Sequence, residues 1–159
     1  MHNEIDFSEV PTKAAWGDLN VDPELSYAYK NFGEKSRLEA EPKFARNVIE
    51  RAGELRIMPG NVFSYYMMAF NDHINFGHYE VADAGDVFSC FIGVVESRLA
   101  SEPEKIMSIM EVIMPTLHWI ANSQDIFRVN REIYGNFSER VYKISDLIGY
   151  SGSSIESRE

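Results

Sequence analysis

Helix-start signals recur along this chain of 159 residues, and they constrain its fold more than any other feature. An aspartate, Asp22, precedes Pro23, so the carboxylate can cap free backbone amides while the fixed φ of proline suits the first helical position. Three later sites place Ser or Asn three residues before Glu, as in a capping box: Ser36 with Glu39, Ser101 with Glu104, and Asn136 with Glu139. The sequence therefore predicts a succession of helices.

Apolar residues recur at helical spacing after each of these starts. Pro115 should kink or split the helix that contains it, because proline removes a backbone hydrogen bond. No segment alternates polar and apolar residues as a strand would, and no Asn-Gly or Asp-Gly hairpin turn is present. The predicted helices are 23–32, one from between 36 and 42 to about 55, 61–76, 83 to about 99, 101 to about 120, 124–134 and 136–148.

These helices define an all-α fold, a single compact domain of six or seven helices packed as antiparallel hairpins because the joints are short. The length fits one domain, and the composition, 45% hydrophobic and 13% aromatic, is that of a globular protein. We expect residues 1–21 to form an extended segment packed on the domain, residues 22–148 to form the helical domain, and residues 149–159 to form a disordered tail.

Acidic residues gather in the middle of the chain. Between residues 61 and 127, nine acidic residues stand against two basic ones, a balance of −7 within a net charge of −10. Such a charge distribution attracts basic protein surfaces and repels nucleic-acid phosphates and anionic membranes. We therefore expect a basic protein partner and neither nucleic acid nor membrane. We call these nine residues the acidic field: Asp72, Glu80, Asp83, Asp86, Glu96, Glu102, Glu104, Glu111 and Asp125.

The single cysteine, Cys90, cannot form an internal disulfide, and its apolar neighbours favour a small buried side chain over a reactive one. The first residues lack the basic and apolar regions of a signal peptide, and no apolar run approaches the roughly 18–20 residues that span a bilayer. These features favour a reducing, cytoplasmic setting.

Residues 72–80 contain two histidines and two carboxylates, which are candidate metal ligands or catalytic groups. Zinc needs three or four such ligands converging at about 2 Å. The spacing argues against a metal site, since His73 and His78 are five apart and Gly77 should end the helix between them. A simpler interpretation leaves Asp72 and His73 on the exposed side of a helix end, where histidine complements the dipole. The alternative is a small metal-dependent or hydrolytic enzyme centred on Asp72, His73, His78 and Glu80.

Other reactive side chains have structural explanations. Asp83 and Asp86 suit the cap and first turn of a helix. His118, beside Trp119, is more typical of a packed core histidine than of a catalytic base. Helical spacing favours core packing for a group of tyrosines and methionines, although a regulatory domain binding a small apolar ligand there is a further hypothesis. This group is Tyr65, Tyr66, Met67, Met68, Met107, Met110 and Met114.

No motif identifies a reaction or a cofactor, so we expect none. The leading interpretation is a non-enzymatic, acidic, helical binding protein. Small acidic proteins that neutralise basic nuclease or other toxins, such as immunity proteins and antitoxins, have this general profile, because opposite charge speeds encounter. Tyr79 is expected to be the exposed aromatic anchor of the patch. The predicted partner-binding residues surround one connection between helices: Asp72, His78, Tyr79, Glu80 and Asp83.

Overall fold

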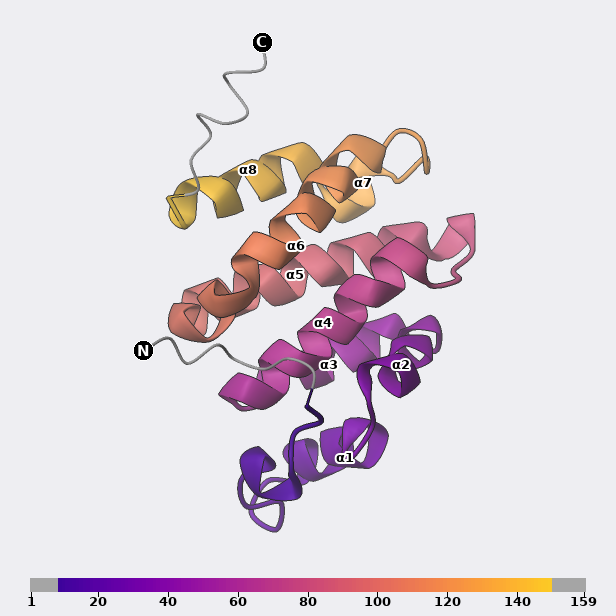
Figure 1. Cartoon of the computed structure of the whole chain (residues 1–159). Helices are drawn as coiled ribbons and strands as arrows, with labels where there is room; N and C mark the ends of the chain where they lie inside the picture. Colours follow the sequence, from indigo (N-terminus) through magenta and orange to yellow (C-terminus); the bar gives the residue numbers. More distant parts are fainter. Residues whose placement is uncertain (1–8, 150–159) are drawn as a thin grey trace.

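The computed structural model describes residues 9–149, and this part of the chain is helical and contains no strand (Figure 1). Six α-helices have ten residues or more, and two others are single turns, which confirms the predicted all-α fold of a single domain. The elements are η1 (Lys13–Trp16), α1 (Pro23–Phe32), α2 (Arg37–Ala40), η2 (Glu41–Ala45), α3 (Val48–Ile57), α4 (Gly60–Phe76), η3 (Val81–Asp83), α5 (Ala84–Ser101), α6 (Pro103–Ser123), α7 (Arg131–Tyr134) and α8 (Phe137–Leu147).

Three of the predicted helix starts are confirmed. Asp22 Oδ1 accepts hydrogen bonds from the backbone amides of Glu24 and Leu25, at 3.0 and 3.2 Å. Ser36 opens α2 with a complete capping box, in which serine and glutamate side chains each accept from the other residue's backbone. Asn136 caps α8 in the same way as Asp22 caps α1, through its side-chain oxygen. Local sequence therefore specified where these helices begin.

The predicted capping box at Ser101 is wrong. Ser101 is the last residue of α5, and its hydroxyl donates to the carbonyl of Ser97 rather than accepting from a following amide. Helix α6 begins two residues later at Pro103, and Glu102 at its N-cap makes no side-chain cap bond. Glu102 instead forms ion pairs with Arg98 of α5 and Lys105 of α6, and it is the single residue between the two helices.

Two predicted helices have different bounds. The helix expected from 36–42 to about 55 is divided into α2, η2 and α3. Asn47, which adopts a left-handed conformation with φ of 54°, separates η2 from α3. In the predicted helix 124–134 only α7 is α-helical, since residues 124–128 form turns and Arg128 also has positive φ. Conversely, Pro115 does not split α6, which is a single helix with the proline exposed on its surface.

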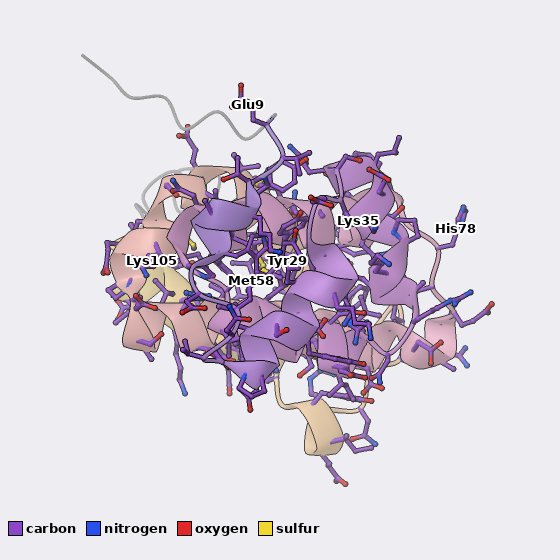
Figure 2. The ribbon with its side chains drawn as sticks, turned by 90° about the horizontal axis from the view of Figure 1, so that it is seen from below. Glu9, Tyr29, Lys35, Met58, His78 and Lys105 are labelled. Carbon is purple, nitrogen blue, oxygen red and sulfur yellow. The ribbon has the colours of Figure 1, made fainter. Side chains whose placement is uncertain are left out.

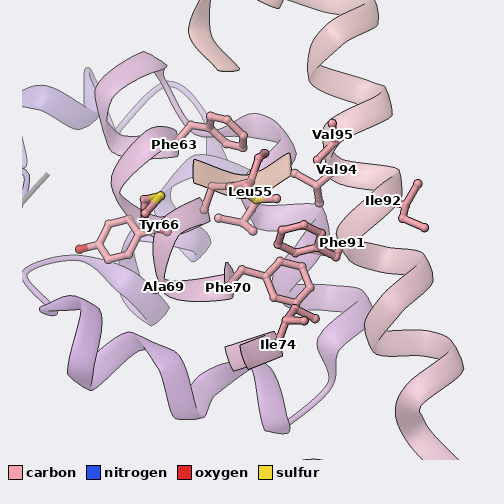
Figure 3. Packing of buried hydrophobic residues seen from close by; sticks show 14 of the residues in the cluster. Leu55, Phe63, Tyr66, Ala69, Phe70, Ile74, Phe91, Ile92, Val94 and Val95 are labelled. Atoms are coloured by element: carbon pink, nitrogen blue, oxygen red, sulfur yellow. The ribbon is translucent and has the colours of Figure 1, made fainter. Parts of the chain in front are cut away.

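Helix α4 is the centre of the core, as its apolar circumference indicates. It packs against α6 on one side and against α2, η2 and α3 on another, while α3 packs against α5. Figure 3 shows Phe70 and Ile74 of α4 beside Phe91 of α5. The expected tyrosine and methionine packing is confirmed for α4, where Tyr65, Tyr66, Met67 and Met68 are buried.

The segment before α1 is anchored on the domain by Trp16. Its buried indole lies 5.2 Å from the ring centroid of Tyr29 and 6.0 Å from that of Tyr66. A single 3-10 turn, η1, brings it there. In Figure 1, α1 lies at one end of the molecule and α8 at the other, with α4, α5 and α6 between them. The segment predicted as a disordered tail lies, apart from Gly149, outside the described residues.

Candidate partner-binding site

The connection between α4 and α5 begins with a close approach to the end of α4. The amide of Gly77 donates to the carbonyl of His73, at 2.9 Å, and closes the helix. A Cβ at this position would lie 2.4 Å from His73 Nδ1 and 2.9 Å from Glu41 Oε2, so only glycine fits without displacement. The chain then turns through residues 78–80 into η3 and α5.

Tyr79 fixes this connection to the core. Its hydroxyl donates to the carbonyl of Ile74, at 2.9 Å, and its ring lies 5.4 Å from His73 and 5.7 Å from Phe88. Burial raises the pKa of the Tyr79 hydroxyl. Tyr79 is therefore half-buried, and the expectation that it is the exposed aromatic of the connection is wrong. That aromatic is Phe76, which is 80% exposed at the last position of α4.

A pocket of about 490 Å³ lies beside this connection. One wall comes from η2 and the start of α3, and the other from the connection and the start of α5. The residues that line it are Phe44, Ala45, Asn47, Val48, Ile49, Gly77, His78, Tyr79, Glu80, Asp83, Asp86 and Val87. We call it the acidic pocket. Four of the five predicted partner-binding residues line it, and His78 extends outward from the molecule in Figure 2.

Phe44 anchors the η2 wall of the pocket on α4. Its ring stacks on Phe70 of α4, with centroids 4.4 Å apart and planes 2° apart, and lies 6.0 Å from His73. Asn47 then opens α3, where its side chain accepts from the amide of Glu50 and donates to the carboxylate of the same residue. Sequence reasoning missed this wall because its residues precede the connection by about thirty positions and carry no local sign of pairing with it.

Three carboxylates of the acidic pocket have no basic partner. Among the described residues, Glu80, Asp83 and Asp86 form no ion pair with lysine or arginine, and no lysine or arginine lines the pocket. Arg46 lies between two lining residues in sequence, but it is exposed and is not itself part of the lining. Only Asp86 is hydrogen-bonded, as acceptor from the Tyr134 hydroxyl at 2.9 Å.

Elsewhere the acidic field is partly neutralised by tertiary contacts. Four of its nine carboxylates are paired with basic side chains, two of them across long stretches of sequence. These pairs are Asp72 with Arg37, Glu96 with Arg140, Glu102 with Lys105, and Asp125 with Arg131. Among the described residues, five carboxylates of the acidic field are therefore left without a basic partner, and three of these five line the acidic pocket. The unpaired negative charge occupies a smaller region than the acidic field as a whole.

Asp72 stands apart from the other predicted partner-binding residues. Its two carboxylate oxygens accept from Nε and a terminal nitrogen of Arg37, at 3.1 and 2.9 Å, and it does not line the pocket. No lysine or arginine is near Asp72 in the sequence, but α2 packs against α4 and supplies this arginine from 35 residues earlier in the chain.

The four residues of the enzyme alternative do not form one cluster. His73 is completely buried, and its Nδ1 lies 2.8 Å from Glu41 Oε2, so the expectation that it sits on the exposed side of the helix end is wrong. His78 and Glu80 are exposed and line the pocket, whereas His73 and Asp72 do not. Within residues 9–149, no three His, Cys, Asp or Glu side chains converge in a way that could hold a metal ion.

Asp83 does not cap α5 through its side chain. It occupies the N-cap position, yet its carboxylate accepts no backbone hydrogen bond, so the expected cap is wrong. Its backbone is helical because η3 runs directly into α5, whereas a side chain that caps a helix normally belongs to a residue with an extended backbone. Asp86, in the first turn of α5, retains the expected favourable position at the positive end of the helix dipole.

A second pocket, of about 380 Å³, lies between the same connection and the α6–α7 region. Its lining includes Val81 and Ala82 from η3 and Phe127 and Val129 from the turns after α6. Near this pocket Val81, Ile126 and Ile133 are exposed apolar side chains. The α4–α5 connection thus separates an acidic pocket from a more apolar one.

The chain matches no model of a known protein family, no curated protein and no solved structure. None of the helices within residues 9–149 combines the length and the apolar composition that crossing a membrane requires.

Proposed function

We propose that this protein is a non-enzymatic binding protein that docks on a basic protein surface through the acidic pocket, in the manner of an immunity protein or antitoxin. The observation that carries the proposal is a set of three carboxylates that line one pocket and have no lysine or arginine partner in the described part of the chain: Glu80, Asp83 and Asp86. Unpaired carboxylates on a surface attract cationic groups and steer a basic partner during encounter.

The chemistry of the pocket suits a lysine or arginine side chain. Ile49, which lines the pocket and is 60% exposed, offers apolar surface for the aliphatic stem, while the carboxylates offer acceptors for the charged head group. Phe76 and Val81, exposed on either side of the connection, add apolar contact area of the kind that supplies binding energy in interfaces. A cytoplasmic setting, expected from the single cysteine, belongs to the same proposal.

The test compares two charge reversals of equal size. In one variant Glu80 and Asp83 become lysine, and neither side chain has a hydrogen-bond or ion-pair partner among residues 9–149 to lose. In the matched control Glu104 and Glu111, exposed acidic residues of α6, become lysine. Asp72 is left unchanged because its reversal would also break the pair with Arg37.

The partner is first isolated by affinity capture of the tagged protein from its native host, followed by mass spectrometry. We expect a stoichiometric basic protein. The pocket variant should lose at least tenfold in affinity, mostly through a slower association rate with weaker salt dependence, whereas the control variant should lose much less. Equal loss in both variants would mean that only net charge matters, and unchanged binding in the pocket variant would exclude the pocket as the docking site.

A further inference from the structure

Gly53 occupies the middle of α3, where glycine is less favourable than alanine because it leaves the unfolded chain more freedom. Two other helical glycines of this protein lie close to side chains. A Cβ on Gly85 would lie 2.5 Å from the Tyr134 ring, and one on Gly93 would lie 2.8 Å from the Arg56 guanidinium. A Cβ on Gly53 would meet no atom within 4 Å. Internal packing therefore does not require glycine at this position.

Gly53 lines a groove of about 470 Å³ between α1 and α3. Tyr27 and Ile57, which flank it, are 49% and 36% exposed, so the groove presents apolar surface to solvent. The full lining is Pro23, Glu24, Tyr27, Glu50, Gly53, Glu54 and Ile57. None of these residues lines the acidic pocket, which receives Val48 and Ile49 from the same helix.

The groove is also negatively charged. Three of its lining residues are glutamates, and none is lysine or arginine. The Glu54 carboxylate is buried, accepts from Asn31 Nδ2 at 2.6 Å, and lies 2.8 Å from Arg51 Nε. Arg51 also pairs with Glu50, at 3.3 Å, so one arginine is shared between two glutamates while Glu24 has none.

We propose that this groove is a separate interaction surface for a segment of another protein that presents an apolar side chain against Gly53 with lysine or arginine beside it. The missing Cβ leaves room for the apolar side chain between Tyr27 and Ile57, and the exposed glutamates Glu24 and Glu50 face the basic residues. A second copy of this chain does not suit the groove, because a twofold axis would bring the same carboxylates of both copies together.

The probe is a blocked five-residue peptide that alternates arginine and leucine, titrated into ¹⁵N-labelled protein and followed by NMR. Two matched peptides replace all arginines by glutamine or all leucines by serine. The arginine–leucine peptide should give saturable shifts at the amides of Tyr27, Gly53 and Ile57, with at least tenfold weaker binding for both matched peptides. Absence of saturable shifts in the groove, or equal binding of the matched peptides, would overturn the proposal.

The variant Gly53→Leu fills the groove with a side chain that meets no atom of the protein at its Cβ, and leucine is a good helix former. We expect its melting temperature to rise and its affinity for the peptide to fall at least tenfold. Unchanged affinity would contradict the proposal. The double variant Glu80→Gln and Asp83→Asn should leave the groove shifts intact. Shifts confined to residues 77–86 would favour the acidic pocket and count against the groove, so the two proposals fail separately.

Discussion

Nδ1 of the buried His73 lies 2.8 Å from Oε2 of the partly exposed Glu41, where α4 meets η2. Gly77 passes so close to this pair that it has no space for a side chain. Phe44 of η2 and Tyr79 of the connection line opposite walls of the acidic pocket, and both rings contact the His73 ring. His73 therefore links the two walls.

Replacing Gly77 by alanine should destabilise the protein by about 1–3 kcal/mol, because the added methyl group must displace His73 or Glu41. Denaturant unfolding followed by circular dichroism measures the change. Gly53→Ala is the matched control, since its methyl group meets no atom, and it should stabilise the protein by roughly 0.5–1 kcal/mol. A Gly77→Ala variant as stable as the control would show that the end of α4 yields without cost.

Arg98 of α5 should be one of the most sensitive positions in the fold. Its buried guanidinium donates to the carbonyls of Leu55 and Met58 at the end of α3 and lies 4.2 Å from the Phe63 ring centroid. Burial lowers the pKa of this guanidinium, while nearby Glu102 opposes the shift. Arg98→Ala should cost about 2–5 kcal/mol, because it removes the partners of these carbonyls and leaves a cavity.

Lysine should not replace this arginine. Arg98→Lys keeps the positive charge, but a single ammonium cannot stack on Phe63 and reach both carbonyls with the same planar geometry. Unfolding measurements should place it within about 1 kcal/mol of the alanine variant. Stability equal to that of the unmodified protein would mean that charge alone, rather than the guanidinium fork, satisfies the end of α3.

Cys90 should react slowly with thiol reagents in the folded protein. Burial raises its pKa to about 11, so little thiolate is present at pH 7.5. Iodoacetamide labelling followed by intact-mass spectrometry should be roughly 100-fold slower than in denaturant, since each unit of pKa reduces the thiolate tenfold. Labelling at similar rates in both conditions would indicate that the thiol is not protected by the fold.

Glu54 should give part of the pH dependence of stability. Burial raises its pKa, and hydrogen bonding from Asn31 and the charge of Arg51 only partly oppose this. Because the folded pKa lies above the unfolded value, protonation of Glu54 favours folding at low pH, and this contribution is lost as pH rises through the folded pKa. The melting temperature of the Glu54→Gln variant should therefore fall less than that of the unmodified protein between about pH 4.5 and pH 7.

The control for this measurement is Glu111→Gln, which removes the same charge from an exposed position of α6. It should follow the pH curve of the unmodified protein more closely than Glu54→Gln does. Identical curves for all three proteins would mean that Glu54 ionises as readily in the folded chain as in the unfolded one.

Local sequence patterns predicted most of the helices, but they did not predict every position at which one helix ends and the next begins. Asp22, Ser36 and Asn136 begin helices because a side-chain oxygen can cap amides within three residues, a contact that sequence spacing alone specifies. Ser101 has the same spacing and fails, since α5 continues through it and α6 begins at Pro103. The choice between continuing and capping depends on which turns pack on neighbouring helices, and this information is absent from a four-residue pattern.

By itself, the sequence determined an all-α domain and an acidic field between residues 61 and 127, because helix periodicity, caps and charge are properties of neighbouring residues. Only the tertiary structure decided which charges remain unpaired. Arg37 neutralises Asp72 across 35 residues, whereas no basic side chain within residues 9–149 pairs with Glu80 or Asp83. The tertiary structure also placed η2 and α3 as the second wall of the acidic pocket. Such contacts depend on how helices pack, and packing is set by the whole core rather than by any one segment.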